Sequence, residues 1–332
     1  MKIWLKRIGL GLAALIVSAV AVGAALEQMA RLRAPRDFPL QGKLVDIGGR
    51  RIQIDCRGQG SPTVLFEAND LEGSLGWSAV QNEVAKTTRA CAYSRAGILW
   101  SDPASGPRDA KALASDLHAL LQKAGEHPPF VLVGHSLGGL YAVLYTQYFG
   151  SEVAGLVLVD PAHPDQTKRI EAITHHPFSA LSPPEKILAK LAWTGVPRLI
   201  IGQDPPKGME AAMAFAPQTL IAMARELNNF DKTLADAGAA HDLGARPLYV
   251  LTSMAPASQA ALNETQMTAA QDAQFRPAWK AMHDEEAAWS HNSQHLLVSD
   301  SGHRIQTDKP ALVVHAIDSV VTAVRSGKPL QP

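Results

Sequence analysis

Short apolar runs rich in β-branched residues alternate along the chain with longer segments whose leucines repeat at helical spacing. Such runs are typical of buried strands, whereas leucines three and four positions apart indicate one face of a helix. Strands that alternate with helices predict an α/β fold with a mostly parallel sheet covered on both faces. The expected strands cover residues 43–47, 50–56, 63–66, 90–93, 130–133, 156–159, 247–251 and 295–298, and the clearest helices cover residues 77–86, 113–121, 140–149 and 310–324.

The first two expected strands are joined by Gly48-Gly49. Two glycines between alternating runs are a strong signal for a β-hairpin, because the turn uses backbone that glycine adopts readily. We therefore expect these two strands to form a hairpin.

The alternation of strands and helices breaks between Asp160 and Pro247. This stretch favours helices, with a short strand at residues 198–201 as the exception. We expect residues 163–244 to form a cap inserted over the carboxyl edge of the sheet. Residues 41–162 and 245–332 then form the core.

Residues 1–30 have the properties of a membrane anchor. Lys2, Lys6 and Arg7 precede an uncharged apolar stretch from Ile8 to Leu26. Its length is close to the ~20 residues that cross a bilayer and exceeds the ~7–15 of a signal-peptide core. Small residues near its end also fit signal-peptidase cleavage, which would release a secreted protein. The charges before the span favour a periplasmic or extracellular body, joined to the anchor by a linker over residues 31–40.

The composition suits one sizeable domain with an insertion, since the chain has 332 residues and is 46% hydrophobic. Its 31 basic and 31 acidic residues balance, so nothing indicates nucleic acid or a polyanionic partner. The sequence contains no phosphate-binding loop, dinucleotide fingerprint or metal motif, and so implies no cofactor and no metal. The oligomeric state stays open.

The segment Gly134-His135-Ser136-Leu137-Gly138-Gly139 joins an expected strand to an expected helix. A G-x-S-x-G at such a junction is typical of a nucleophile elbow, where a sharp turn exposes the serine hydroxyl beside free helix N–H groups. We therefore expect Ser136 to be a nucleophile.

From about Pro39 to Val324 the chain resembles the α/β-hydrolase fold family, in its capped serine hydrolase branch. The resemblance is carried by the elbow and by the segments 93–97, 100–103, 155–163 and 301–303. It implies an eight-stranded sheet in which the second and fourth strands are neighbours. Cys56 and Cys91 would lie on these strands, which makes a disulfide between them an expectation.

The resemblance also implies a catalytic triad in the chain order serine, acid, histidine. His303 follows the last strand after a Ser-Gly turn, where the histidine of the family lies. Most members carry the acid after the strand at 247–251, but Thr252–Asn263 contains no Asp or Glu. A minority carry it one strand earlier, where this chain has Asp160, and a carboxylate that only caps the following loop is the alternative. Glu264 and Asp272 are the fallback acids.

An oxyanion hole requires two N–H groups aimed at the developing charge. We expect one from Leu137, directly after Ser136. The other is expected from the loop after residue 66, where the family usually has glycine and this chain has Asn69-Asp70. Asn69 tolerates left-handed backbone and would replace the glycine, and the Asp70 N–H would be the donor.

These features predict a serine hydrolase that cleaves a carboxylic ester, or an amide, lactone or thioester, in a small-molecule acyl substrate. An acyltransferase is the alternative within the enzyme class. A catalytically silent domain that binds a small ligand or a partner is the alternative outside it, favoured by the unusual oxyanion loop and the displaced acid.

Overall fold

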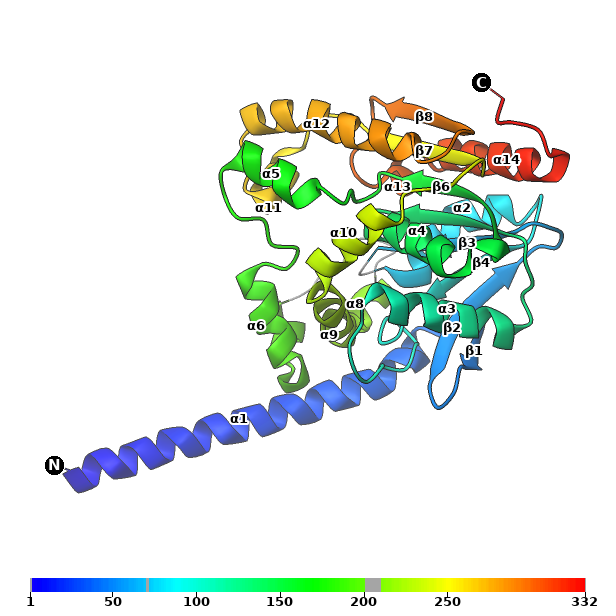
Figure 1. The fold of residues 1–332 in the computed structure, drawn as a ribbon. Helices are drawn as coiled ribbons and strands as arrows, with labels where there is room; N and C mark the ends of the chain where they lie inside the picture. Colours follow the sequence, from blue (N-terminus) through cyan, green and yellow to red (C-terminus); the bar gives the residue numbers. More distant parts are fainter. Residues whose placement is uncertain (1, 70–71, 201–209, 332) are drawn as a thin grey trace.

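The structure, a computed structural model, describes residues 2–69, 72–200 and 210–331. It contains one eight-stranded sheet in the order β1-β2-β4-β3-β5-β6-β7-β8 (Figure 1). The pairs β1–β2 and β2–β4 are antiparallel and all later pairs are parallel. The strands are β1 (Lys43–Asp46), β2 (Arg51–Arg57), β3 (Thr63–Glu67), β4 (Ala90–Ser94), β5 (Phe130–His135), β6 (Val153–Val159), β7 (Leu248–Ser253) and β8 (Ser293–Val298).

Helices cover both faces of this sheet. The longer helices of the core are α2 (Ser78–Val84), α3 (Ala110–Ala124), α4 (Leu137–Phe149), α12 (Ala269–Ala287) and α14 (Pro310–Ser326), with the short α11 (Gln259–Thr265) and α13 (Ile305–Asp308). Neighbouring strand residues serve opposite faces: Leu132 packs with α3 and α4, whereas Val131 and Val133 pack with α2 and α14. The apolar runs without polar alternation follow from burial on both faces. The predicted α/β architecture is confirmed.

The β1–β2 hairpin turns at Gly48 and Gly49, which have φ angles of +111° and +91°. Both glycine N–H groups donate to Oδ1 of Asp46, at 2.8 and 2.9 Å. The positive φ values explain why two glycines stand at this turn. The predicted hairpin is confirmed.

Strands β2 and β4 bring the two cysteines opposite each other, with Cys56 paired in register with Cys91. Their sulfur atoms are bonded in the structure. This disulfide joins two strands that are separated by 35 residues in sequence. It lies at the amino end of β4, away from the strand ends that carry the candidate site.

The described residues between β6 and β7, where the sequence predicts a cap, form six α-helices and one short 3-10 helix, η3 (Ala192–Thr194). The α-helices are α5 (Gln166–Thr174), α6 (Pro183–Leu191), α7 (Val196–Ile200), α8 (Glu210–Ala214), α9 (Ala216–Leu227) and α10 (Phe230–Ala239). The strand predicted at residues 198–201 is wrong, because Val196–Ile200 is helical and Ile201 lies outside the described residues. A short apolar run such as Leu199-Ile200-Ile201 fits either structure, so its pattern alone could not decide between them.

Helix α1 (Lys2–Asp37) projects from the body, with the N-terminus at its far end (Figure 1). Within it, Trp4–Asp37 is long and apolar enough to cross a membrane, with a mean hydropathy of 2.3 in its most apolar window; signal sequences pass the same test. The linker predicted over residues 31–40 is helical as far as Asp37. Ala34 explains the continuation, because it is buried in an apolar cluster with Leu99 and Phe215.

Candidate active site

Ser136 lies between the end of β5 and the first residue of α4. Its φ and ψ angles are 55° and −126°, a strained conformation for a residue with a side chain. Its N–H donates to the Val159 carbonyl at 3.2 Å, and its own carbonyl accepts from Gly139 at 2.9 Å and Ala162 at 3.0 Å. These three bonds hold the strained turn in place, and the Ser136 residue is half-buried.

The glycines of the elbow are required by close backbone approach. A Cβ on Gly138 would meet the carbonyl oxygens of Glu67 and Ala68, at 2.5 and 2.8 Å. A Cβ on Gly139 would meet the Pro161 ring at 2.8 Å. The start of α4 is therefore packed tightly between the segments that follow β3 and β6.

Asp160 follows β6 directly and is 1% exposed. Its Oδ2 atom lies 2.6 Å from Nδ1 of His303. The remaining capacity of the carboxylate is filled by Ser253, whose N–H and hydroxyl each donate at 2.8 Å, and by Nε1 of Trp279 at 2.9 Å. Asp160 thus accepts from four donors. Its contact with Nδ1 fixes the orientation of the His303 ring.

The ionisation of Asp160 follows from these contacts. Burial alone would raise the pKa of its carboxyl, but the hydrogen bond and charge of His303 outweigh burial and lower it below its ordinary value. His283 and the Ser253 N–H act in the same direction. Asp160 is therefore an anion at neutral pH, as an acid that orients a histidine must be.

His303 lies in the loop after β8, and its side chain is 49% exposed. Its backbone carbonyl lies 2.8 Å from Nε2 of His135, and the two rings are 4.7 Å apart. Since His135 directly precedes Ser136, this contact brings the His303 loop to the elbow. The structure thus gathers the predicted Ser136, Asp160 and His303 at the carboxyl ends of β5, β6 and β8, the sheet edge where ligands bind in α/β folds.

His135 is a buried neighbour of the site that sequence reasoning missed. Burial lowers its pKa to about 3, so the ring is neutral and available for hydrogen bonds. Its Nδ1 atom lies 3.1 Å from the amide nitrogen of Gln306. Trp279 and Ser253 were missed as well, since nothing in their sequence context distinguishes them from core residues.

A second histidine lies behind Asp160. Nδ1 of His283 is 4.0 Å from the Asp160 carboxylate, and its Nε2 atom lies 2.9 Å from the Pro161 carbonyl. Burial lowers the pKa of His283 to about 4, so it is also neutral. The Thr252 hydroxyl lies 2.6 Å from both His283 and His295, which connects this histidine to the edge strand β8.

The fallback acids lie in other surroundings. Asp272 pairs with Arg276 at 3.2 Å and accepts from the Ala257 N–H at 3.3 Å. The side chain of Glu264 lies outside the described residues. Among the described carboxylates, Asp160 is the one bonded to His303 in the structure.

For the oxyanion hole, the structure describes two of the three predicted residues. Leu137 is the buried first residue of α4, directly after Ser136. Asn69 is half-buried, and Asp70 lies outside the described residues. The contact of Gly138 with Glu67 and Ala68 brings the end of β3 against the start of α4.

Arg95 forms hydrogen bonds with the end of β3 and the residues that follow it. Its Nη1 atom donates to the carbonyl of Ala68 and the carboxylate of Glu67, each at 2.6 Å, and its Nη2 atom donates to the carbonyl of Asn69 at 3.1 Å. Nε of Arg95 donates to Glu226 at 3.0 Å, and Glu226 lies on α9 in the predicted cap interval. The three charged side chains, Arg95, Glu67 and Glu226, are buried, so one guanidinium joins the predicted oxyanion loop to helix α9.

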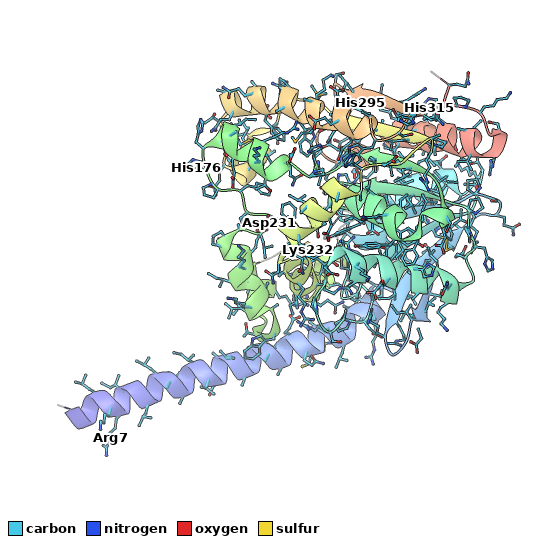
Figure 2. All side chains as sticks on the ribbon, in the orientation of Figure 1. Arg7, His176, Asp231, Lys232, His295 and His315 are labelled. Carbon is cyan, nitrogen blue, oxygen red and sulfur yellow. A yellow bond between two sulfur atoms is a disulfide. The ribbon has the colours of Figure 1, made fainter. Side chains whose placement is uncertain are left out.

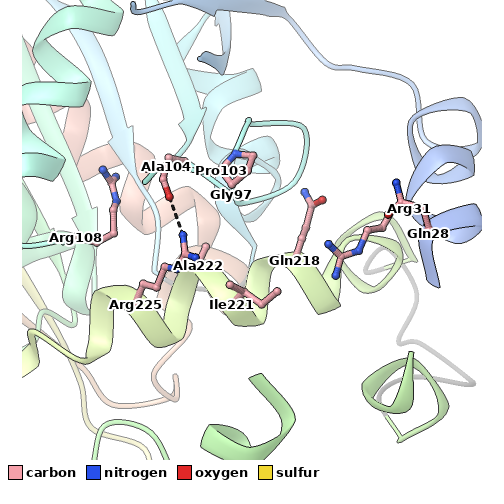
Figure 3. Close-up of a pocket in the computed structure, with 11 residues that line it drawn as sticks. Gln28, Arg31, Gly97, Pro103, Ala104, Arg108, Gln218, Ile221, Ala222 and Arg225 are labelled. Carbon is pink, nitrogen blue, oxygen red and sulfur yellow. Dashed lines mark hydrogen bonds between the residues drawn. The ribbon is translucent and has the colours of Figure 1, made fainter. Parts of the chain in front are cut away.

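A cavity of about 370 Å³ lies apart from the Ser136 turn, between α1, the loop after β4 and α9 (Figure 3). Among its described lining residues are three arginines and no carboxylate: Arg31, Arg108 and Arg225. In Figure 3 Arg108 and Arg31 lie toward opposite ends of the row of side chains along α9. The arginines therefore do not converge on one point.

Two groups of described residues have the spacing of metal ligands. The first contains Cys56 and Cys91, whose sulfurs are already bonded to each other. The second contains His163, Asp165 and Glu285, but Arg169 occupies the Glu285 carboxylate at 2.6 Å. Neither group carries an argument for a metal.

With this geometry in view, the comparisons with known proteins decide the family. The model of the Alpha/beta hydrolase family matches residues 35–316. The chain belongs to the alpha/beta hydrolase family. The match extends from the end of α1 to the middle of α14 and includes every candidate site residue.

Several known proteins resemble the chain, either at low identity or over a short part of their length. An "AB hydrolase superfamily protein" from Gibberella zeae is 24% identical over 291 residues, covering 80% of this chain and 87% of that one. The structure of a thermophilic esterase from Thermogutta terrifontis has a TM-score of 0.59 at 19% identity, covering 86% of this chain and 99% of that one. That likeness shows the fold alone. The "Probable transporter efuK" of Hormonema carpetanum is 35% identical over 127 residues, but the match spans only 36% of this chain and 18% of that relative.

Proposed function

We propose that this alpha/beta hydrolase is a serine hydrolase that cleaves a carboxylic ester, or a related acyl bond, through an acyl-enzyme on Ser136. The observation that carries the proposal is the 2.6 Å contact between His303 and a buried, fully hydrogen-bonded Asp160, beside a strained serine turn. A serine is a poor nucleophile until a base accepts its proton, and the base must be oriented by an acid.

The reaction follows from the roles of the three residues. Ser136 Oγ attacks the carbonyl carbon while His303 Nε2 takes the serine proton, and Asp160 stabilises the imidazolium that forms. The Leu137 N–H, with a second donor from the Asn69-Asp70 loop, binds the oxyanion. The tetrahedral intermediate then collapses, and the leaving alcohol takes the proton from His303. Water attacks the acyl-enzyme in the same manner and releases the acid.

A fluorophosphonate probe tests this proposal, because it forms a covalent bond only with an activated serine. We expect labelling of the wild-type protein and its loss in Ser136→Ala. Ser319→Ala is the control: Ser319 lies on α14 and donates to the carbonyl of His315 at 2.8 Å, and this variant should label as wild type does. Folded wild-type protein that takes no label would support the silent binding domain instead.

We further propose that α1 anchors the protein in a membrane with the catalytic body exported. The end of the helix supports retention over cleavage, because it is built into the body: Glu27 is 2% exposed and bonded to Arg31 and Arg198, each at 2.8 Å. Intact mass of the purified membrane fraction tests the anchor. A protein that begins beyond Ala25 would show cleavage.

A further inference from the structure

The cap carries most of the exposed apolar surface that the structure describes outside α1. Five of the eight large apolar side chains exposed there lie in residues 187–199, which we name the cap apolar segment. Leu199 is 73% exposed, Ile187 57% and Trp193 56%. An apolar surface concentrated in this way marks an interaction site. The five residues are Ile187, Leu191, Trp193, Val196 and Leu199.

The cap apolar segment is packed directly against α1. A Cβ on Gly23 would meet the Thr194 carbonyl, and a Cβ on Gly195 would meet the Gly23 carbonyl at 2.7 Å. These backbone contacts leave no room for a side chain. Arg198 then bonds Glu27 one turn further along α1. The relative position of the two elements is therefore fixed at Gly23.

Gly23 lies inside the apolar stretch of α1, which ends at Leu26. At 1.5 Å per residue, the contact lies about 4–5 Å inside the end of that stretch. Helices that lie in a bilayer interface bury their apolar face about 5–10 Å. If α1 spans a membrane, the cap apolar segment is placed at the depth of its interface.

Basic side chains lie close to the exposed apolar residues of this region. Further exposed apolar side chains lie on the neighbouring part of α1, at Leu26, Met29 and Leu32. Arg31 lines the cavity of Figure 3, whose described lining residues include three arginines and no carboxylate. Lys186 and Lys190 are exposed on α6, whereas Glu185 of the same helix is bonded within its capping box and Glu27 of α1 is buried and paired. Exposed apolar residues with basic side chains close by suit a bilayer with anionic lipids.

We propose that the cap apolar segment binds the surface of the lipid bilayer beside α1, so that the cap of the hydrolase lies on the membrane. The inference rests on the anchoring by α1 proposed above and is independent of the catalytic role of Ser136. A second copy of the chain could instead cover the cap apolar segment, and the test must distinguish this copy from the lipid bilayer.

Labelled cysteines in the full-length protein test the proposal, since Cys56 and Cys91 are bonded to each other and leave other positions free for labelling. The probe is bimane, in nanodiscs that hold one copy of the protein and contain phosphatidylcholine, phosphatidylglycerol and a nitroxide-bearing lipid. The test positions are Ile187→Cys and Leu199→Cys. Leu297→Cys, on edge strand β8 and 40% exposed, is the matched control, and Ile16→Cys reports whether α1 is inserted.

We expect quenching by the nitroxide lipid at positions 187 and 199 to exceed that at 297 about threefold, as interfacial burial of about 5–10 Å requires. If quenching at positions 187 and 199 is no greater than at 297 while position 16 is quenched, the proposal is overturned but membrane anchoring by α1 is supported. No quenching at any position, 16 included, would overturn both. If positions 187 and 199 are protected only in nanodiscs that hold two copies, a second copy of the chain covers the cap apolar segment, and the proposal is overturned. Melting curves of each variant verify that it is folded.

Discussion

Nδ1 of His303 lies 2.6 Å from Oδ2 of Asp160, although 143 residues separate them in sequence. The contact exists because Asp160 directly follows β6 and His303 lies in the loop after β8, at the same edge of the sheet. Asp160 reaches it with a φ angle of +45°, which costs backbone energy and is held by four donors to its carboxylate.

The first prediction concerns this contact. Asp160→Asn should lower kcat/KM for a p-nitrophenyl ester by about 10⁴, since loss of the orienting acid leaves the histidine in the wrong tautomer. Asp272→Asn is the matched control, because Asp272 pairs with Arg276 instead, and it should keep its activity within a few-fold. An Asp160→Asn enzyme as active as the control would refute the assignment.

The second prediction concerns Trp279, which donates its indole N–H to Asp160 at 2.9 Å. Trp279→Phe keeps most of the side chain but removes one hydrogen bond to a charged group, so we expect kcat/KM to fall about tenfold. The pKa of Asp160 should rise, and the acid limb of the pH–rate profile should move to higher pH. Trp289→Phe serves as control, because the Trp289 ring packs against His163 and not against Asp160. A profile unchanged in both variants would contradict the role.

The third prediction concerns Arg95, whose guanidinium bonds the Ala68 and Asn69 carbonyls as well as Glu226 of the cap. A lysine cannot span these groups at once, so Arg95→Lys should lower kcat by about 10-fold to 100-fold through a misplaced oxyanion loop. KM should change much less. Arg89→Lys, which alters a similar two-bond pair with Glu126 far from the site, should change neither constant.

The fourth prediction concerns stability against pH. Burial lowers the pKa of His135 to about 3 and that of His283 to about 4, while unfolded histidines titrate near 6.5. Between pH 6.5 and about 4 the unfolded chain binds more protons, so the free energy of unfolding decreases as the pH falls. Each histidine contributes about 1.4 kcal/mol per pH unit to this slope.

Urea unfolding in detergent at several pH values between 6.5 and 5 measures the slope. His283→Gln should reduce it by about 1.4 kcal/mol per pH unit. His315→Gln, on the exposed surface of α14 (Figure 2), should leave it unchanged. Equal slopes for wild type and His283→Gln would show that His283 does not remain neutral in the folded protein.

Part of this molecule could be predicted from local sequence, since local chemistry determines it. The strands were predicted because short apolar runs without polar alternation are typical of strands buried on both faces. The hairpin was predicted because Gly48 and Gly49 favour the positive φ angles that the turn has. Gly138 marks the elbow because a side chain would strike the Glu67 and Ala68 carbonyls. The position of Asp160 at a strand end was also visible, but its partner was suggested by family resemblance alone.

Tertiary structure decided the rest, because long-range contacts outweigh local preference. Residues 198–200 are helical although a strand was predicted there, and α1 continues to Asp37 because Ala34 packs into a distant cluster. His135, Trp279 and Arg95 acquire their roles only from neighbours far away in sequence. The sequence by itself therefore determined the strands of the sheet and the glycine-flanked serine turn, whereas the order of the partners of Ser136 came from the family resemblance. Only the tertiary structure decided which donors bind the buried Asp160 carboxylate. It also decided that Arg95 bonds both the loop after β3 and Glu226 of α9. The physical reason is that burial and hydrogen bonding depend on residues far apart in sequence.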